Sequence, residues 1–514
     1  MLVREEAGMI REIGQILRGK SNIRPDPRDR RFRHPVWQQN QFYKRVMQSY
    51  LAWRQSLINV VDNAAASTDD RSRAQFALSL ITEALAPTNS YLGNPGAIKR
   101  IAETRGRSIL HGLKNFAEDV IHNGGLPRQV DESKFQVGKN LASTPGAVVY
   151  RDAVMEVIQY KPATSRVFSR PALVVPPQIN KFYVVDLAPG RSFAEYATAN
   201  GVPLYTISWR NPTAAQRDWS LETYLEACKK AIEVVKDISR CDSVNVLAAC
   251  AGGYTLATLL GHLAASGDTS VHSATFLVTI LDTTAPTMMS MFASKNAIAA
   301  ALRRSRTKGV LDGRDMNRAF AWLRPNDLIW LFVANNWVMG NDPPAFDILY
   351  WNADSTRLPA EFHADLLSIY LENPLARKNR LTVLGTPIDM SKVDIDTYVL
   401  AGITDHITPW QACYETHNVL SGSRCQFVLS SSGHIQSIVN PPSNPKAKYY
   451  LNAGLDGDAD EWLAGATGHA GSWWDHWLDW YGQHGGKKRA APKTLGSKTY
   501  PAGDLAPGRY VHQR

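Results

Sequence analysis

The sequence has no apolar run close to the roughly 20 residues that a helix needs to cross a bilayer. Its first 20 residues also lack the uninterrupted apolar stretch of a secretory signal, because charged residues interrupt them at Arg4, Glu5, Glu6, Arg11 and Glu12. We therefore expect no transmembrane segment and a location in the cytoplasm. Internal repeats are lacking too, which argues against a solenoid or a propeller.

Cysteine is scarce and shows no paired spacing. The chain has five, an odd number, at Cys228, Cys241, Cys250, Cys413 and Cys425. This pattern is typical of a reducing compartment and not of a disulfide framework. The spacing of Cys and His suggests no metal site, and we expect no cofactor.

Acidic residues are outnumbered, which gives a net charge of +10. Such a balance favours anionic partners, whether nucleic acid, a phosphorylated substrate or a charged surface. The basic residues are spread along the chain and do not form one patch with interleaved aromatics, so we expect no nucleic-acid partner. Acyl-CoA, with its phosphates, suits the charge equally well.

At 514 residues the chain should form two or three units. Residues 1–140 are predicted as a mainly helical N-terminal domain, with helices over 39–61, 71–85 and 96–121. Proline breaks residues 24–32 too often for a helix. Residues 141–482 form the predicted catalytic domain, and the Gly-, Pro- and Lys-rich residues 483–514 form a tail that we expect to be ordered only by docking.

Strands and helices alternate through the catalytic domain. Entry strands are predicted over 147–150 and 155–160, and apolar strands follow over 172–175, 202–208, 244–249 and 274–281. A helix is predicted over 221–238. This alternation indicates βαβ units and a mostly parallel, doubly wound α/β sheet.

Residues 244–253 are the most informative stretch. A β-branched apolar run stops at Ala248-Ala249-Cys250-Ala251-Gly252, and a helical pattern follows from Thr255 to about Leu263. Small residues two before and two after a nucleophile are typical of the nucleophile elbow of α/β-hydrolases. The helix N-terminus would favour a thiolate at Cys250. The alternative is that Cys250 is a buried small residue at a strand end.

An elbow predicts an acid and a base after later strands. Asp405 follows the strand-like residues 394–402, and His434 follows residues 425–429. The order and placement of all three residues predict the triad Cys250, Asp405 and His434. His406 is interpreted as a polar wall residue, and Asp394 and Asp396 as solvated charges at a strand start.

The oxyanion hole of this fold takes one amide from the residue after the nucleophile, here Ala251. The other comes from the loop after the strand 172–175. Pro176 and Pro177 have no N–H to donate. We therefore choose the amide of Ile179, with Gln178 as the alternative.

Two aromatic regions have no predicted chemistry. A long insertion over about 283–380 contains the apolar stretches 288–292 and 330–337. Insertions here commonly cap the active site of this fold, although these side chains could equally form the core of the insertion. The tryptophan-rich residues 473–481 are predicted as the final helix against the sheet, with contact to a granule or membrane as the alternative.

A cysteine nucleophile suits an acyltransferase that works from acyl-CoA. Its thiolate would exchange one thioester for another at little free-energy change, and transfer to an alcohol would then be downhill. His434 would take the proton of Cys250, while Asp405 would orient His434 or help to deprotonate the incoming hydroxyl. An apolar cap would exclude water.

The sequence also resembles the class II, medium-chain-length poly(3-hydroxyalkanoate) synthases over nearly its whole length. The matching blocks are residues 29–32, 175–183, 208–212, 346–352, 405–410, 432–437 and 510–512. The resemblance implies an α/β-hydrolase fold, the nucleophile, acid and base at Cys250, Asp405 and His434, and polymerisation of (R)-3-hydroxyacyl-CoA with release of CoA. It also implies a homodimer on the surface of polyester granules, together with phasin-type proteins.

The elbow departs from the family at two positions. Class II members usually have Gly and Ser where this chain has Ala248 and Ala251. The Ala251 amide remains as an oxyanion donor, but a hydroxyl is lost beside the nucleophile. We expect activity to be retained. The alternatives are a thiol hydrolase that cleaves polyester or thioester, and an inactive granule-coating protein.

Overall fold

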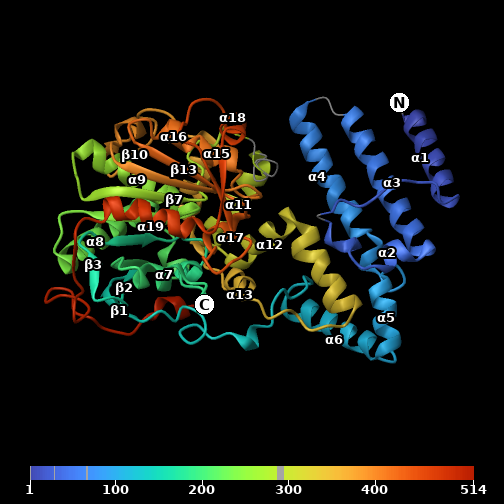
Figure 1. The fold of residues 1–514 in the computed structure, drawn as a ribbon, viewed down its shortest axis with the longest axis horizontal. Helices are drawn as coiled ribbons and strands as arrows, with labels where there is room; N and C mark the ends of the chain where they lie inside the picture. The colour runs from blue at the N-terminus through green and yellow to red at the C-terminus, as the bar shows by residue number, and fades with distance from the viewer. Residues whose placement is uncertain (1, 28, 65–66, 286, 288–294) are drawn as a thin grey trace. The chain divides into compact units, whose positions relative to one another are not determined.

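The computed structural model describes residues 2–27, 29–64, 67–285, 287 and 295–514 (Figure 1). The chain divides into two compact units. Unit 1 contains Met1–Glu132 and Asn317–Phe346, and unit 2 contains Ser133–Met316 and Asp347–Arg514. Residues 317–346, from the middle of the predicted insertion, therefore belong to the same unit as the N-terminal helices. No helix among the described residues is long and apolar enough to cross a membrane.

The helices of unit 1 come mainly from the first part of the chain. They are α1 (Leu2–Leu17), α2 (Val36–Gln39), α3 (Gln41–Ala64), α4 (Thr68–Ala84), α5 (Pro95–Glu103), α6 (Arg107–His122) and two π-helical turns, η6 (Asn326–Trp330) and η7 (Val333–Val338). Helix α12 (Gly313–Leu323) crosses the division. The predicted single helix over 96–121 is two helices, because Arg105 and Gly106 adopt positive φ angles of 51° and 81°.

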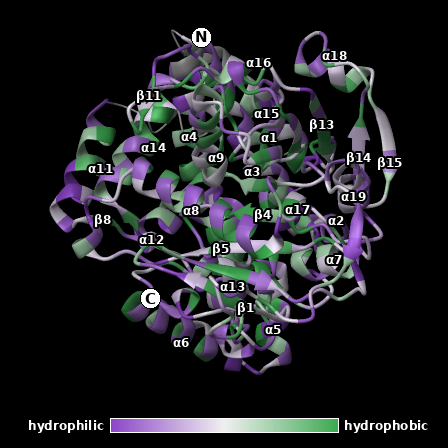
Figure 2. Ribbon diagram, turned by 90° about the vertical axis from the view of Figure 1, so that its left-hand side faces the viewer, coloured by the Kyte–Doolittle hydropathy of each residue, from purple (hydrophilic) through white to green (hydrophobic). Residues whose placement is uncertain are grey.

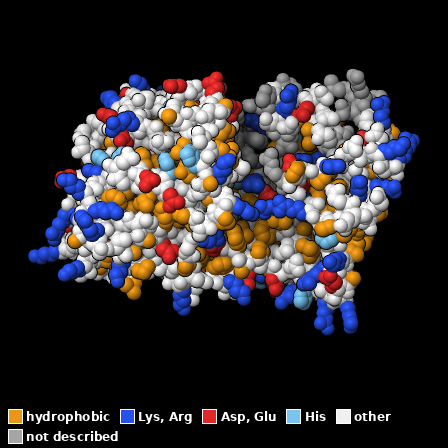
Figure 3. All heavy atoms as spheres, in the orientation of Figure 1, with side chains coloured by type: hydrophobic (Ala, Val, Ile, Leu, Met, Phe, Trp, Pro, Cys, Tyr) orange, Lys and Arg blue, Asp and Glu red, His pale blue; other side chains and the backbone are white. Residues whose placement is uncertain are grey.

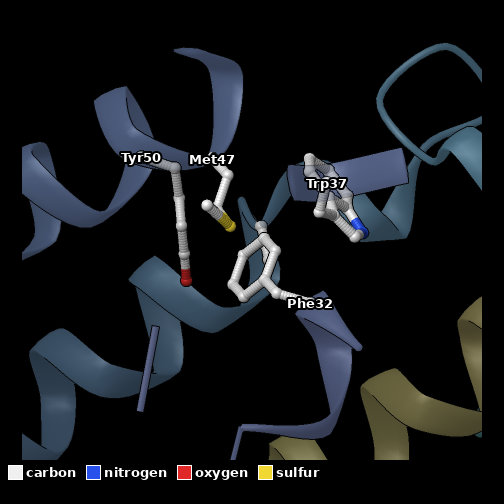
Figure 4. Packing of buried hydrophobic residues seen from close by; sticks show 5 residues of the cluster. Phe32, Trp37, Met47 and Tyr50 are labelled. Carbon is white, nitrogen blue, oxygen red and sulfur yellow. The ribbon is translucent and has the colours of Figure 1, made fainter. Parts of the chain in front are cut away.

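Two apolar clusters hold unit 1 together. In the first, Phe32, Trp37, Met47 and Tyr50 pack around one another, with the rings of Phe32 and Trp37 edge to face at 5.0 Å (Figure 4). In the second, Ala97 of α5 packs with residues from the insertion, namely Ala321, Ile329, Val333 and Val338. The N-terminal helices thus share a core with residues 317–346.

Unit 2 is built on one large sheet. Its strands are β1 (Gly146–Arg151), β2 (Met155–Tyr160), β4 (Ala172–Val175), β5 (Leu204–Trp209), β6 (Val244–Ala249), β7 (Val271–Leu277), β12 (Asp396–Gly402), β13 (Cys425–Ser430), β14 (Lys448–Leu451) and β15 (Thr467–Ala470). Their order is β1-β2-β5-β4-β6-β7-β12-β13-β14-β15, and β5 through β13 run parallel. This confirms the predicted doubly wound, mostly parallel sheet.

Helices and short strands surround the sheet. They are α7 (Phe193–Ala199), α8 (Leu221–Ser239), α9 (Ala251–Ser266), α11 (Lys295–Lys308), α13 (Asp347–Ala353), α14 (Ala360–Glu372), α15 (Trp410–Tyr414), α16 (Thr416–Val419), α17 (His434–Ile438), α18 (Ala459–Ala464) and α19 (Trp473–His484), with β3 (Arg166–Phe168), β8 (Val310–Leu311), β9 (Leu358–Pro359), β10 (Thr382–Val383), β11 (Thr386–Pro387) and β16 (Lys488–Ala490). Every residue of β4, β5 and β6 is buried, and Figure 2 shows β4 in hydrophobic colours. Burial on both faces explains why these strands read as continuous apolar runs.

The residues after α19 dock on the sheet. Strand β16 pairs with β3, and the buried Glu156 of β2 accepts hydrogen bonds from the amides of Arg509 and Tyr510 at 3.1 and 3.0 Å. The side chain of Asn211 donates to the carbonyl of Gln513 at 3.2 Å.

On the face drawn in Figure 3, Lys and Arg side chains are scattered and do not gather in one block.

Candidate active site

Cys250 lies in a strained turn between β6 and α9. Strand β6 ends at Ala249, α9 begins at Ala251, and Cys250 itself has φ 49° and ψ −123°. A non-glycine residue with positive φ is uncommon, and such strain gathers at functional sites. The turn presents Cys250 at the N-terminus of α9, where the helix dipole favours negative charge.

The glycines after Cys250 allow this turn to pack against two neighbouring strand ends. A Cβ atom on Gly252 would lie 2.7 Å from the carbonyl oxygen of Val175, at the end of β4. On Gly253 it would lie 2.3 Å from the Thr279 side chain, just beyond β7. Thr279 also donates a hydrogen bond to the Cys250 carbonyl at 3.3 Å. Side chains at 252 and 253 would therefore displace the turn that holds Cys250.

Asp405 lies just beyond the carboxyl end of β12, and its side chain is fully buried. Oδ1 accepts hydrogen bonds from the amides of Ile407 and Thr408 at 2.8 and 3.0 Å, and Oδ2 accepts from Thr408 Oγ1 at 2.7 Å. Burial opposes ionisation, but the charge of His434 and these donors outweigh it and lower the pKa of Asp405. Asp405 is thus held as a carboxylate.

His434 is the first residue of α17 and follows β13. Its Nδ1 lies 2.7 Å from Asp405 Oδ2, and Cys250 is near enough to its ring to influence its pKa. Burial lowers the pKa of His434, but the charge of Asp405, the neighbouring Cys250 and the hydrogen bond to Asp405 raise it to about 10. The arrangement favours an imidazolium beside the Asp405 carboxylate at neutral pH.

The three residues meet for a topological reason. Strands β6, β12 and β13 are parallel members of one sheet, so their carboxyl ends lie at the same edge. Each of Cys250, Asp405 and His434 follows one of these ends. A nucleophile, a base and an orienting carboxylate brought together in this way can carry out acyl transfer.

The loop after β4 approaches the elbow, and hydrogen bonds from Trp209 and Thr356 hold it in place. The Trp209 ring donates to the Pro176 carbonyl at 2.9 Å. Thr356 donates through its hydroxyl to the Gln178 carbonyl at 2.6 Å and through its amide to the Ile179 carbonyl at 3.3 Å. The Gln178 carbonyl and the Ile179 N–H belong to the same trans peptide and point in opposite directions. Because Thr356 binds the Gln178 carbonyl, the Ile179 N–H points away from Thr356.

Ala251 is the first residue of α9, so its amide has no acceptor within the helix. It is 5% exposed. The side chain of Gln178 donates to Thr255 Oγ1 of α9 at 3.0 Å, which ties the β4 loop to the nucleophile helix. Two candidate oxyanion donors, Ala251 and Ile179, thus belong to elements that are joined next to Cys250.

The sequence alternatives occupy other places. Asp396 begins β12, whereas Asp405 follows its end, and Asp396 pairs with Arg424 and His484 at 2.7 and 2.9 Å. His406 is half-buried beside the acid. Among the residues that the structure describes, no group of three or more His, Cys, Asp or Glu side chains is arranged to hold a metal ion.

Sequence reasoning missed several residues around the triad. Thr408 binds the acid, and Thr356 holds the β4 loop. Tyr254, one turn after Cys250, and the buried Cys413 interact electrostatically with Cys250. Burial raises the pKa of the Cys413 thiol well above its usual value. Only the spacing of Tyr254 on the nucleophile helix could have indicated its place.

The aromatic regions also have definite places. Residues 288–292 lie outside the described residues. In the stretch 330–337, Val333 is buried and Trp330 and Trp337 are partly buried in the second cluster of unit 1. Trp473, Trp474 and Trp477 are at most 1% exposed, so α19 packs as the predicted final helix.

Comparison with known proteins gives two family matches. Residues 28–197 match the family described as the N-terminus of poly-beta-hydroxybutyrate polymerase (PhaC), and residues 171–441 match the alpha/beta hydrolase fold. The second match covers more than half of the chain and confirms the predicted α/β-hydrolase fold.

Three relatives are similar over almost the whole chain. Poly(3-hydroxyalkanoate) polymerase 1 of Ectopseudomonas oleovorans is 51% identical over 98% of this chain and 90% of its own length. Polymerase 2 of the same organism is 49% identical with the same coverage. The polymerase subunit PhaC of Cupriavidus necator is 38% identical over 96% of this chain and 84% of its own.

Proposed function

The chain belongs to the poly(3-hydroxyalkanoate) polymerases, and we propose that it polymerises medium-chain (R)-3-hydroxyacyl-CoA through a covalent thioester on Cys250. As a member of this family it is an acyltransferase. The observation that carries the covalent route is that Cys250 lies at the same edge of the parallel sheet as the hydrogen-bonded pair His434 and Asp405.

In the first step the Cys250 thiolate attacks the carbonyl carbon of the hydroxyacyl-CoA thioester. The oxyanion that forms accepts hydrogen bonds from the amides of Ala251 and Ile179. The bond between the acyl carbon and the CoA sulfur breaks, and the His434 imidazolium protonates the departing thiolate. The acyl group is now a thioester on Cys250, at little change in free energy.

In the second step His434, now neutral, takes the proton of a 3-hydroxyl group. The hydroxyl oxygen attacks the acyl carbon on Cys250, the carbon–sulfur bond breaks, and the thiolate is restored beside the new imidazolium. The product is an oxoester, which is more stable than the thioester it replaces. Repetition of both steps lengthens the polyester.

Asp405 orients His434 and stabilises its charge. Each of its oxygens already accepts a hydrogen bond, and the carboxylate is fully buried. These contacts support the orienting role over the alternative in which Asp405 itself deprotonates the incoming hydroxyl. The hydroxyl would need a free position on a carboxylate that is already occupied.

The test is CoA release and product analysis with (R)-3-hydroxydecanoyl-CoA. The proposal predicts CoA release in step with polymer, and no free 3-hydroxy acid as the main product. Free acid in place of polymer would identify a thiol hydrolase. If wild type releases no CoA, and Cys250→Ala binds polyester particles as well as wild type does, the protein would be an inactive granule component.

Helix α6 supports a polyester surface as a second partner, because its amphipathic character is inverted. The residues it buries are Ser108, Gly112, Asn115 and Asp119, and the apolar residues it exposes are Leu110, Leu113, Phe116, Val120 and Ile121. Asn115 donates to the carbonyls of Asn336 and Asn341, and Asp119 accepts from the Trp337 ring at 2.8 Å. The polar face is thus satisfied within unit 1.

The apolar face of α6 stays largely open among the described residues: Leu110 and Ile121 are 67% and 72% exposed, while the Phe116 ring meets Trp337 edge to face at 5.0 Å. A protein interface usually adds a hydrogen bond for every 100–200 Å² or so. This stripe carries aliphatic side chains and one phenyl ring without polar groups between them, so it suits a surface that offers apolar contact alone. A medium-chain polyester offers alkyl side chains and no hydrogen-bond donor, so it fits this stripe.

Binding to particles of poly(3-hydroxyoctanoate) tests this surface. The change is Leu113→Gln with Val120→Gln. Burying each half-exposed side chain is worth about 1 kcal/mol, so the bound-to-free ratio should fall about ten- to thirty-fold. The control is Leu371→Gln with Leu505→Gln, at exposed positions of unit 2. Equal sedimentation of both variants with the particles would contradict the role of α6.

The remaining expectations stay predictions. They are a homodimer, phasin-type granule proteins, a cytoplasmic location, and a cap formed by the insertion over about 283–380 of the catalytic domain 141–482. Light scattering of the purified protein measures the first. Pull-down with a phasin on polyester particles measures the second.

A further inference from the structure

The helix that carries His434 cannot hold its own orientation. Helix α17 contains only five residues, with His434 at its first position. Helices this short are not stable alone in water, so their geometry comes from tertiary contacts. The last carbonyls of α17 and those of the residues after it also lack donor partners within the helix. Whatever binds these carbonyls fixes the direction of α17.

Three consecutive residues at the start of α19 bind them. The indole N–H of Trp473 donates to the Ser437 carbonyl at 2.6 Å, and that of Trp474 donates to the Ile438 carbonyl at 3.1 Å. The hydroxyl of Ser472 donates to the Asn440 carbonyl. Both indoles are at most 1% exposed, so water does not replace these donors.

On the other side, α17 is pressed against β12. A Cβ atom on Gly402, the last residue of β12, would lie 2.5 Å from Ser437 Oγ. The glycine therefore lets α17 approach the strand end that precedes Asp405. The helix is held between β12 and the two tryptophans, and His434 projects from it to Asp405 at 2.7 Å.

We propose that Trp473 and Trp474 are positioning residues for His434. Their N–H groups fix the end of α17 and so keep the imidazole in hydrogen-bonding reach of both Cys250 and Asp405. Without one N–H, a buried carbonyl is left without a donor, and α17 gains by moving to find another. The inference rests on the assignment of His434 as the base.

Trp477 provides an internal control. It belongs to the same helix, is equally buried, and its N–H donates to Thr275 Oγ1 of β7 at 3.1 Å, away from α17. All three rings pack around Phe193 of α7. Replacing any of them by phenylalanine keeps an aromatic ring in that packing and removes one N–H. A purely structural role predicts the same result at all three positions.

The experiment compares Trp473→Phe, Trp474→Phe and Trp477→Phe by CoA release from (R)-3-hydroxydecanoyl-CoA over a range of pH. We expect kcat to fall about ten-fold or more in the first two, because small displacements of a catalytic group are costly, while KM stays within about two-fold. The alkaline limb of their rate profile should move to lower pH, since His434 loses contact with the Asp405 carboxylate. Trp477→Phe should keep the wild-type limb and most of kcat.

Two results would overturn the proposal. One is an unchanged kcat and alkaline limb in both Trp473→Phe and Trp474→Phe. The other is an equal loss in all three variants that follows their loss of thermal stability. Failure of the proposed function would give different results. His434→Gln would release CoA as fast as wild type, or wild type itself would release no CoA.

Discussion

The charge of Asp405 should control the protonation of His434, and Asp405→Asn tests this. The variant keeps the shape of the side chain and removes its charge. The pKa of His434 lies at about 10, against an ordinary 6.5. At about 1.4 kcal/mol for each pH unit, that difference corresponds to roughly 5 kcal/mol of net stabilisation of the imidazolium.

Asp405 is the larger of the two attractive partners of His434, ahead of Cys250. With both side chains at most 6% exposed, solvent screens their interaction little. If Asp405 supplies about 3–4 kcal/mol of the total, kcat should fall by roughly two to three orders of magnitude at neutral pH. The alkaline limb of the rate profile should move from near pH 10 toward pH 7.

The assay is initial CoA release from pH 6 to pH 10, with the background hydrolysis of the thioester subtracted. Stability gives an independent check. A raised pKa means that the pair stabilises the fold fully below pH 6.5 and loses its effect as the pH rises through about 10. The difference in free energy of unfolding between wild type and Asp405→Asn should shrink over that range. Near-normal kcat with an unmoved limb would refute the ion-pair account.

Three further changes test the surroundings of the site. Gly253→Ala should abolish CoA release, because the new methyl group would collide with the Thr279 side chain. Adding Thr279→Ala should restore part of the activity, and a double variant without any recovery would contradict this steric explanation. Thr356→Val should lower kcat about ten-fold without changing KM, because it removes the hydroxyl that binds the Gln178 carbonyl in the oxyanion loop. Thr356→Ser keeps that hydroxyl and should stay close to wild type. Equal kcat in the two variants would show that this hydrogen bond does not support the oxyanion loop. Cys413→Ala should keep wild-type activity and should be inactivated by iodoacetamide at the wild-type rate, since the Cys413 thiol stays protonated and unreactive. A variant that resists alkylation would show that Cys413, and not Cys250, is the reactive cysteine.

The sequence predicted the sheet well because its central strands are buried on both faces. Strand β4 occupies the predicted residues 172–175, and β6 ends at the predicted elbow. The order nucleophile, acid, base could be read because each residue directly follows a buried apolar run. The structure places these three side chains together, and their catalytic roles stay predictions.

Other parts depend on contacts that no local pattern reveals. No helix is predicted before residue 39, yet α1 occupies residues 2–17. The edge strands β14 and β15 were missed, since they are short and partly exposed. The insertion residues 317–346 pack with the N-terminal helices, because polar side chains of α6 such as Asn115 find their acceptors there.

The hydrogen bonds from Trp473 and Trp474 to α17 were equally hidden. A run of tryptophans indicates burial or a membrane contact, but not which carbonyls the indoles will bind. The nearest sequence signal was the prediction of a final helix over 473–481. The distance of some 36 residues between donor and acceptor places this information in the tertiary fold.

The covalent intermediate on Cys250 is the central claim, and intact-protein mass measurement after rapid quenching tests it most directly. Wild type mixed with (R)-3-hydroxydecanoyl-CoA should gain the mass of hydroxyacyl units, and peptide mapping should locate them on Cys250. Cys250→Ala should gain no mass, release no CoA and form no polymer. Polymer and CoA release from Cys250→Ala at the wild-type rate would contradict the account.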